Sequence, residues 1–406
     1  MTPIPASRAD AQAMDAQDPL RALRDHFDLD DNLIYLDGNS LGAPPKTALA
    51  RLHHTAEVEW KRDLIKSWNT AGWMDLPKTC GAKIASLIGV LPDDVIIADS
   101  VSINIFKIAS ALWSASGGAV AYIDGEFPTD GYILQGLAHL TGARLMKLPD
   151  DEPDAIPSAV KILVKSVVHY KTAAIADIDT WERVAVQNGV SIIWDLSHAT
   201  GILNLALKDA GARYAVGCGY KFLNGGPGAP AYLYVDKAAA NKLTQPLSGW
   251  MGHAKPFDFA DGYAPSDGVG RFACGTPPIL SLCALDAALD VFKEVSMATV
   301  EAKAAMLGDI LLAQCTTPGL KTISPAVGQK RGGHISFHHE NGYEIAQAMI
   351  AKNVVGDFRA PAVLRFGFSP LYIRYTDIWD AAVILKDILT GEKWREPAFA
   401  KRQAVT

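Results

Sequence analysis

A lysine and an aspartate in this chain each follow an apolar segment that is typical of a buried strand. Lys221 ends segment 214–221 and precedes a glycine-rich turn at 224–228, and Asp195 ends segment 190–195. A lysine in such a place is costly to remove from water unless its amine has a use. Together the two residues fit a pyridoxal phosphate site, in which the lysine forms the Schiff base and the acid keeps the pyridine nitrogen protonated. Taken singly, each also fits a plainer role, as a surface lysine or a helix cap.

Other side chains that can do chemistry follow neighbouring strands. In an open parallel sheet, ligands bind beyond the carboxyl ends of the strands. Ser102 opens a helix whose free N–H groups suit a phosphate, although an ordinary serine cap has the same pattern. After the next strand, Phe127 can stack on a planar ring and Asp130 can meet a polar ring substituent, and Thr172 follows a further strand. Each signal is weak alone, but all of them share the strand-end position.

Strands and helices alternate through the first two thirds of the chain, which predicts an α/β fold with a mostly parallel central sheet. The predicted strands are 95–98, 119–123, 144–148, 164–169, 190–195, 213–218 and 231–235, and the predicted helices are 103–113, 131–140 and 181–187. A helical pattern at 279–295 leads into a small α+β unit with strands 334–337, 354–359 and 364–368 and helices beginning near 299, 343 and 377. The predicted organisation is an N-terminal arm (1–45), a large cofactor-binding domain (46–290) and a small C-terminal domain (291–406).

Composition excludes several classes of partner. The chain has 38 basic and 44 acidic residues and no long basic run, which argues against nucleic acid and anionic membranes. No segment approaches the roughly 20 apolar residues of a membrane span, and the N-terminus lacks the apolar stretch of a secretory signal, so a cytoplasmic protein is expected. The five cysteines are scattered and the histidine pairs lack partners at ligand spacing, so neither a disulfide framework nor a metal site is predicted.

Six motifs make the chain similar to the kynureninase family over almost its full length. They are Leu36-Asp37-Gly38-Asn39-Ser40-Leu41-Gly42, Glu126-Phe127-Pro128-Thr129-Asp130, Asp195-Leu196-Ser197-His198-Ala199, Gly219-Tyr220-Lys221-Phe222-Leu223-Asn224, Gly249-Trp250-Met251-Gly252-His253 and Gly275-Thr276-Pro277-Pro278-Ile279-Leu280. The first and fifth separate this family from its relatives among the aspartate-aminotransferase-like (fold type I) pyridoxal phosphate enzymes. The resemblance implies hydrolytic cleavage of the Cβ–Cγ bond of L-kynurenine, or of its 3-hydroxy form, to an anthranilate and L-alanine, a step of tryptophan catabolism and NAD biosynthesis.

The resemblance also implies roles for individual residues. Lys221 becomes the Schiff-base lysine, Asp195 the partner of the pyridinium, and Tyr220 a phosphate ligand that can relay a proton. The other implied cofactor contacts are Val101, Ser102, Phe127, Thr129, Asp130, Thr172, His198 and, from the neighbouring subunit of a homodimer, Trp250 and Thr276. Arg365 matches the arginine that clamps the substrate carboxylate, with Arg359 as a near competitor and Asn39 and Ser40 as further substrate contacts. Thr129 and Thr276 stand where some members carry Ser and Asn, and both keep a polar group.

Two rival functions remain open from the sequence. A cysteine desulfurase or other lyase on the same fold needs a nucleophilic cysteine on a mobile loop, but Cys315 ends a helix-like run and is expected to pack there. Desulfurases also tend to carry His, not Tyr, directly before the lysine. A scaffold without activity is disfavoured because Lys221, Asp195 and Arg365 are all present. The sequence leaves open the preference for kynurenine or 3-hydroxykynurenine, the choice between the two arginines, and the proton donor at the γ-carbonyl.

Overall fold

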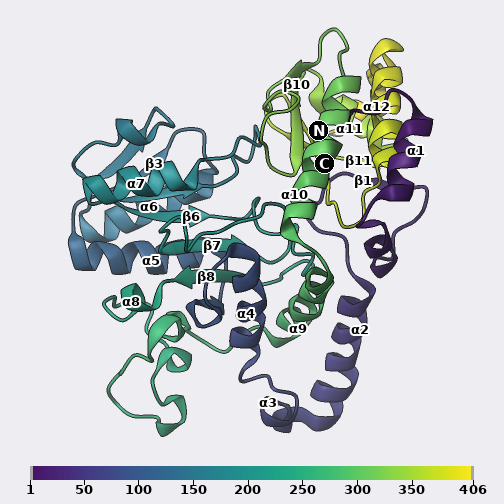
Figure 1. The fold of residues 1–406 in the computed structure, drawn as a ribbon. Coiled ribbons are helices and arrows are strands. Elements are labelled where there is room, and N and C mark those ends of the chain that lie inside the picture. Colours follow the sequence, from purple (N-terminus) through teal and green to yellow (C-terminus); the bar gives the residue numbers. More distant parts are fainter. Residues whose placement is uncertain (1–2, 404–406) are drawn as a thin grey trace.

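Seven short apolar strands form the larger sheet of the protein (Figure 1), in a computed structural model that describes residues 3–403. They are β2 (Val95–Ile97), β3 (Ala119–Ile123), β4 (Leu145–Leu148), β5 (Val160–Ser166), β6 (Ser191–Asp195), β7 (Tyr214–Cys218) and β8 (Ala231–Val235). Their order is β2-β8-β7-β6-β5-β3-β4, and β8 runs antiparallel to both of its neighbours while the other pairs are parallel. The predicted mostly parallel sheet is confirmed.

Both faces of this sheet are covered by helices because successive strand residues point to opposite sides. In β6, Ile193 packs with the cluster that contains α5 (Val101–Ser116) and α6 (Pro128–Thr141). Trp194, the next residue, joins the other cluster, which contains α4 (Leu76–Ile88), α7 (Ile178–Asn188) and α9 (Ile279–Ala288). The strands are therefore apolar on both faces over most of their length, as the sequence pattern requires.

A smaller unit follows, built on an antiparallel sheet of order β12-β13-β10-β9. Its strands are β9 (Lys321–Thr322), β10 (His334–His338), β12 (Asp357–Arg359) and β13 (Val363–Gly367), and its helices are α10 (Met297–Gln314), α11 (Gly342–Ile350) and α12 (Tyr375–Thr390). The start of the chain packs here as well: α1 (Arg8–Gln17) contacts α12, and β1 (Ile34–Tyr35) pairs with β11 (Val354–Val355). Figure 1 shows this contact as the purple N-terminal helix beside the yellow C-terminal one.

Three further helices are short. They are α2 (Lys46–His54), continued by a π-helical segment at 55–63, then α3 (Ser67–Thr70) and α8 (Lys237–Ala240). Short 3₁₀ turns include 250–252, 256–258 and 268–272, in the loop region between β8 and α9. No helix within residues 3–403 is long and apolar enough to cross a membrane.

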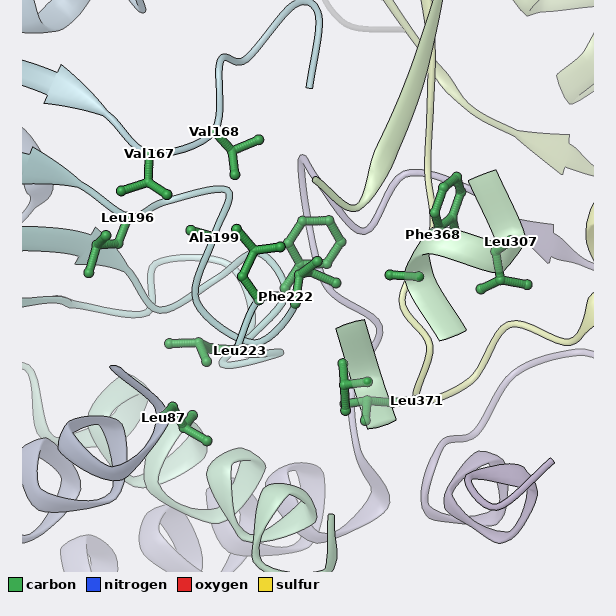
Figure 2. Packing of buried hydrophobic residues seen from close by; sticks show 14 of the residues in the cluster. Leu87, Val167, Val168, Leu196, Ala199, Phe222, Leu223, Leu307, Phe368 and Leu371 are labelled. Atoms are coloured by element: carbon green, nitrogen blue, oxygen red, sulfur yellow. The ribbon is translucent and has the colours of Figure 1, made fainter. Parts of the chain in front are cut away.

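One apolar cluster runs from the large sheet into the small unit, with Phe222 near its middle (Figure 2). Leu196 and Ala199 lie on one side of Phe222 and Phe368 on the other. The backbones of Gly201 and Gly333 approach Phe222 so closely that an added Cβ atom would lie 3.0–3.3 Å from its atoms. Because Phe222 directly follows Lys221, this packing fixes the backbone of the lysine.

The structure differs from the predicted elements at several places, and the predicted strand 354–359 is in fact two strands, β11 and β12, that belong to different sheets. β5 covers 160–166, not 164–169, because the chain turns after Ser166 and Val168 pairs only in an isolated bridge with Ile175. The predicted helix at 279–295 is α-helical only to Ala288 and continues as a 3₁₀ turn to Glu294. The predicted helix at 181–187 begins earlier, at Ile178 of α7, because the Asp177 carboxylate caps the helix by accepting from the Thr180 N–H.

Candidate active site

A cavity of about 1220 Å³ lies at the carboxyl ends of β3, β5, β6 and β7, the edge where ligands bind in open parallel sheets. The residues along it that matter for chemistry are Val101, Ser102, Phe127, Thr129, Asp130, Ser166, Asp195, His198, Tyr220, Lys221 and Thr276. Each of these strands contributes its last residue or residues shortly after its end, so segments far apart in the chain meet at one sheet edge. The expectation that the chemical side chains gather beyond the strand ends is confirmed.

Lys221 lies three residues beyond the end of β7 and next to a buried histidine. Its Nζ is 3.3 Å from Nε2 of His198, which follows β6. Burial lowers the pKa of His198 well below its usual value, and the charge of Lys221 lowers it further. The imidazole is therefore neutral. It can hydrogen-bond to the lysine amine without placing a second positive charge beside it.

Two buried carboxyl groups lie along the same cavity as this lysine. Asp195 is 7% exposed, and its Oδ1 accepts a hydrogen bond from the Ser197 N–H at 2.8 Å. Asp130 is 1% exposed, and neither of its carboxyl oxygens has a hydrogen-bond partner among the described residues. Burial raises the pKa of Asp130 far above its usual value, and the nearby Asp195 and Glu126 raise it further. The site thus holds more acceptors than its own donors satisfy.

A loop from the start of the chain closes on the backbone at the lysine. The Gly42 N–H donates to the carbonyl oxygen of Tyr220 at 2.8 Å. A Cβ atom on Gly42 would lie 2.2 Å from the carbonyl oxygen of Lys221 and 2.4 Å from the side chain of Asn224. The second glycine of the Gly-Asn-Ser-Leu-Gly motif is needed because only a residue without a side chain fits this approach. Tyr220 itself is part-exposed, and burial raises its pKa.

Two arginines and an aspartate from the small sheet lie beside this loop. Arg365 is 1% exposed, and its Nε donates to Oδ1 of Asp357 at 2.8 Å while its Nη2 donates to Oδ2. Its Nη1 donates to the carbonyl oxygen of Tyr170 at 2.6 Å. The side chain of Arg359 is 43% exposed, and its Nη2 lies 2.7 Å from Oδ2 of the same Asp357. The Ser40 hydroxyl also donates to this Oδ2, at 2.8 Å. One carboxylate therefore holds both candidate arginines.

Comparison with known proteins gives this arrangement a family. The model of the kynureninase C-terminal domain matches residues 300–385. Curated kynureninases from Burkholderia mallei (strain SAVP1) and Pseudomonas fluorescens are 43% and 41% identical to this chain, over 98% of it and 100% of each relative. This chain belongs to the kynureninase family. The membership confirms the predicted resemblance and the predicted enzyme class, a pyridoxal phosphate-dependent hydrolase.

Solved structures support the fold of this kynureninase family member. A cysteine desulfurase, CsdA from Escherichia coli, superimposes with a TM-score of 0.77 over 91% of this chain and 98% of its own, at 16% sequence identity. A second cysteine desulfurase, from Thermococcus onnurineus NA1, gives a TM-score of 0.78 at 16% identity and the same coverage. Identity this low shows the shared fold type I architecture and no more.

The residues present in the kynureninase site fit a bound pyridoxal phosphate. The unpartnered oxygens of buried Asp130 can bind a polar substituent of the ring, and the carboxyl group of Asp195, at the same cavity, suits the protonated ring nitrogen. Lys221 stands at the same cavity with its amine next to neutral His198. At the start of α5, the N–H groups of Val101 and Ser102 lie at the cavity and have no intrahelical partners, as a phosphate site requires.

Not every predicted site residue reaches this cavity. Thr172 does not line it among the described residues: its hydroxyl lies 3.1 Å from Nδ1 of His169 and accepts from the Ala174 N–H. Because β5 ends at Ser166, the strand-end place that the sequence analysis gave to Thr172 belongs to Ser166, which does line the cavity. Trp250 likewise does not line the cavity of its own chain in the described part, although Thr276 does.

The predicted substrate contacts Asn39, Ser40 and Arg365 lie near one another, but among the described residues none of the three lines this cavity. Asn39 is 1% exposed, and neither its amide oxygen nor its amide nitrogen has a partner in residues 3–403. Ser40 bonds to Asp357 and lies within 3.4 Å of Arg365. The predicted arginine site therefore also contains the buried carboxylate of Asp357, which the sequence did not predict.

Asp357 and Tyr170 were not assigned by the sequence analysis. Asp357 lies directly opposite Arg365 in the β12–β13 pair, so recognising the two strands as a hairpin would have revealed it. Tyr170 lines the cavity, and its ring meets Phe127 edge-on with the centroids 5.4 Å apart. His334, at the start of β10, is fully buried without a partner at either ring nitrogen in the described chain, and its ring lies 5.8 Å from that of His198.

Proposed function

We propose that this chain cleaves the Cβ–Cγ bond of L-kynurenine or 3-hydroxy-L-kynurenine with water, which gives an anthranilate and L-alanine. The observation that carries the proposal is the union of whole-length similarity to kynureninases with a cavity that brings Lys221, Asp195 and His198 together. A cysteine desulfurase needs a nucleophilic cysteine on a mobile loop. Cys315 is instead buried at the end of α10, where burial raises the pKa of its thiol to about 12. That function is disfavoured.

Each residue at the centre of the site has a chemical task in this proposal. Pyridoxal phosphate, when bound, supplies a ring that accepts the electrons released at Cα and then at Cβ. Asp195 keeps the ring nitrogen protonated, and Lys221 holds the cofactor and carries the Cα proton. Neutral His198 beside Nζ allows the lysine amine to take up a proton without a second charge nearby. Tyr220, or His198 through water, is our candidate donor at the γ-carbonyl.

Arg365 is the proposed anchor of the substrate carboxylate. Its Nε and Nη2 edge is taken by Asp357, and Nη1 donates to the Tyr170 carbonyl oxygen, so the substrate would meet the guanidinium at the N–H groups that these contacts leave. Arg359 adds a second, more exposed positive charge to the same group. Two arginines around a single buried aspartate leave an excess of positive charge, which suits an anionic ligand.

We further propose a cytoplasmic homodimer in which Trp250 and Thr276 contact the cofactor of the partner subunit. Several large apolar side chains of this chain are exposed, as a covered interface would explain. They are Trp60, Leu64, Ile65, Trp250, Phe257 and Phe259. The five cysteines are all unpaired, as in a reducing compartment. Residues 46–290 and 291–406 are the proposed large and small domains, and residues 1–45 are the proposed arm.

The activity is tested with purified protein, pyridoxal phosphate and each kynurenine. We expect anthranilate, or its 3-hydroxy form, together with L-alanine in equal amounts, and a Schiff-base absorbance band. Lys221→Ala should lose the band and nearly all turnover. Sulfide release from L-cysteine without cleavage of either kynurenine would overturn the proposal.

The shared site is tested by mixing two inactive variants, Lys221→Ala and the double variant Trp250→Ala/Thr276→Ala, under conditions that exchange subunits. If the sites are shared, one site of each mixed dimer carries both lesions and the other carries none. Activity should then recover towards roughly a quarter of wild type, since half of the dimers are mixed and each has one intact site. No recovery, with exchange confirmed by mass, would contradict the assignment across subunits.

A further inference from the structure

A lysine outside the proposed catalytic machinery is fully buried below the phosphate end of the site. Lys107 lies in α5, about two turns from the start of the helix, and is 0% exposed. Removing an ammonium group from water costs several kcal/mol unless charged or polar partners replace the water. The structure supplies two partners, and they come from different segments.

One partner belongs to the turn that opens α5. The Nζ of Lys107 donates to Oδ2 of Asp99. Asp99 has a φ of +46°, which is unfavourable for a residue with a side chain, and its carbonyl oxygen accepts from the Ala231 N–H of β8 at 2.9 Å. The ion pair and the strand contact together hold Asp99 in this conformation, and Asp99 is followed at once by the helix start with Val101 and Ser102.

The other partner belongs to the loop that carries Thr276. The same Nζ donates to the carbonyl oxygen of Phe272 at 2.6 Å, and the Phe272 ring is buried in the cluster that packs on α5. The loop that carries Trp250 is attached to the same segment: the Met251 N–H donates to the Cys274 carbonyl, and an added Cβ atom on Gly249 would lie 2.1 Å from that oxygen. Lys107 therefore connects the start of α5 to the segment that carries Thr276 and, through that segment, to the loop that carries Trp250.

We propose that Lys107 is a positioning residue for the cofactor phosphate, which holds both the α5 N-terminus and the Thr276 loop in place. This inference rests on the proposed function, because it takes both elements as phosphate contacts. Lys107 does not line the cavity in the described part of the chain, and it acts through Asp99 and Phe272. In the proposed homodimer it serves two sites at once, since α5 faces its own cofactor and the loop faces that of the partner.

The test compares two ligands that differ only in the phosphate. Apoenzyme of wild type and of Lys107→Met, which keeps the chain length without the charge, is titrated with pyridoxal phosphate and with pyridoxal, and the Schiff-base absorbance gives each affinity. Lost charge-assisted hydrogen bonds predict about tenfold weaker binding of pyridoxal phosphate and a change within about twofold for pyridoxal. Equal weakening for both ligands, or no weakening, would overturn the proposal.

A second buried lysine provides a matched control for the general effect of removing a buried charge. Lys303 in α10 is 5% exposed and also bonds one aspartate and one backbone carbonyl, Asp18 at 2.7 Å and Pro370 at 2.6 Å, in the small unit. Lys303→Met should lower the melting temperature and leave both affinities unchanged. A selective loss of pyridoxal phosphate binding in this variant would count against the specific role of Lys107.

A second variant keeps the proposal testable if Lys107→Met does not fold. Asp99→Asn removes the ion pair and leaves the Lys107 bond to Phe272, so roughly threefold weaker binding of pyridoxal phosphate alone is expected. Unchanged binding in this variant would also overturn the proposal. Failure of wild type itself to form a Schiff base would instead reject the proposed function, so the two failures are distinguishable.

Discussion

Asp357 and Arg365 lie directly opposite each other in the β12–β13 pair and are joined by two hydrogen bonds between carboxylate and guanidinium. Both residues are almost completely buried, at 2% and 1% exposure. A pair of this geometry fixes the plane of the guanidinium and decides which of its N–H groups remain for a ligand. Asp357 therefore determines how Arg365 can bind the substrate carboxylate.

Asp357→Asn should raise KM for L-kynurenine about tenfold and change kcat by less than about threefold, because the asparagine amide offers one acceptor and turns N–H groups towards the guanidinium. Arg365 then loses its fixed orientation. The binding of L-alanine should weaken while that of L-alaninamide, which lacks the carboxylate, stays constant. Asp377→Asn, which removes a buried partner of Arg374 at the start of α12, is the matched control. An unchanged or lower KM would show that Asp357 only neutralises the charge of the arginines and does not orient Arg365.

Asp195→Asn should keep the fold and slow the exchange of the Cα proton of bound L-alanine with solvent deuterium by about 100-fold or more, because a neutral amide cannot keep the ring nitrogen protonated. Proton NMR of L-alanine in D₂O measures this step without the later bond cleavage. The exposed Asp151, which pairs with Lys165, provides the control variant Asp151→Asn. Exchange at the wild-type rate would remove Asp195 from the mechanism.

Gly42→Ala should abolish most activity, since the new Cβ atom would lie 2.2 Å from the Lys221 carbonyl oxygen and would push the loop off the catalytic lysine. Activity and thermal unfolding are measured together. Gly136→Ala is the control, because no atom lies within 4 Å of its added Cβ and alanine is favoured inside a helix. We expect it to be active and slightly stabilised; equal behaviour of the two variants would refute the close-approach argument.

Glu182→Gln should stabilise the protein increasingly as pH rises. Glu182 accepts from the Trp194 indole at 2.7 Å, and burial raises its pKa from 4.5 to about 7. Below about pH 4.5 both folded and unfolded chains hold the proton; between 4.5 and 7 only the folded chain does, so wild type loses stability across this window and no more above it. The variant keeps the hydrogen bond and lacks this loss, which is on the order of 3 kcal/mol when complete.

Denaturant unfolding at several pH values, with activity measured alongside, checks this profile. Glu57→Gln on the surface should change the profile far less, since Glu57 is exposed beside Lys61. A stability difference between Glu182→Gln and wild type that does not grow between pH 4.5 and 7 would show that the folded-state pKa is not raised.

Local patterns were sufficient for most of the large sheet. β3, β6, β7 and β8 fall where unbroken apolar runs predict them, because strands buried on both faces leave that signature. β5 was displaced because the apolar pair Val167-Val168 continues the run past the point where the chain turns. That displacement moved the predicted strand-end residue from Ser166 to Thr172.

By itself the sequence determined that Asp195 ends one strand and that Lys221 closely follows its neighbour, since the order of apolar segments and breakers decides where parallel strands stop. Only the tertiary structure decided which partners meet there. The pairing of Arg365 with Asp357 depends on strand register, and the contact of Lys107 with Phe272 joins segments 165 residues apart. Such contacts are set by how whole elements pack, and a pattern that repeats every two to four residues carries no information about them.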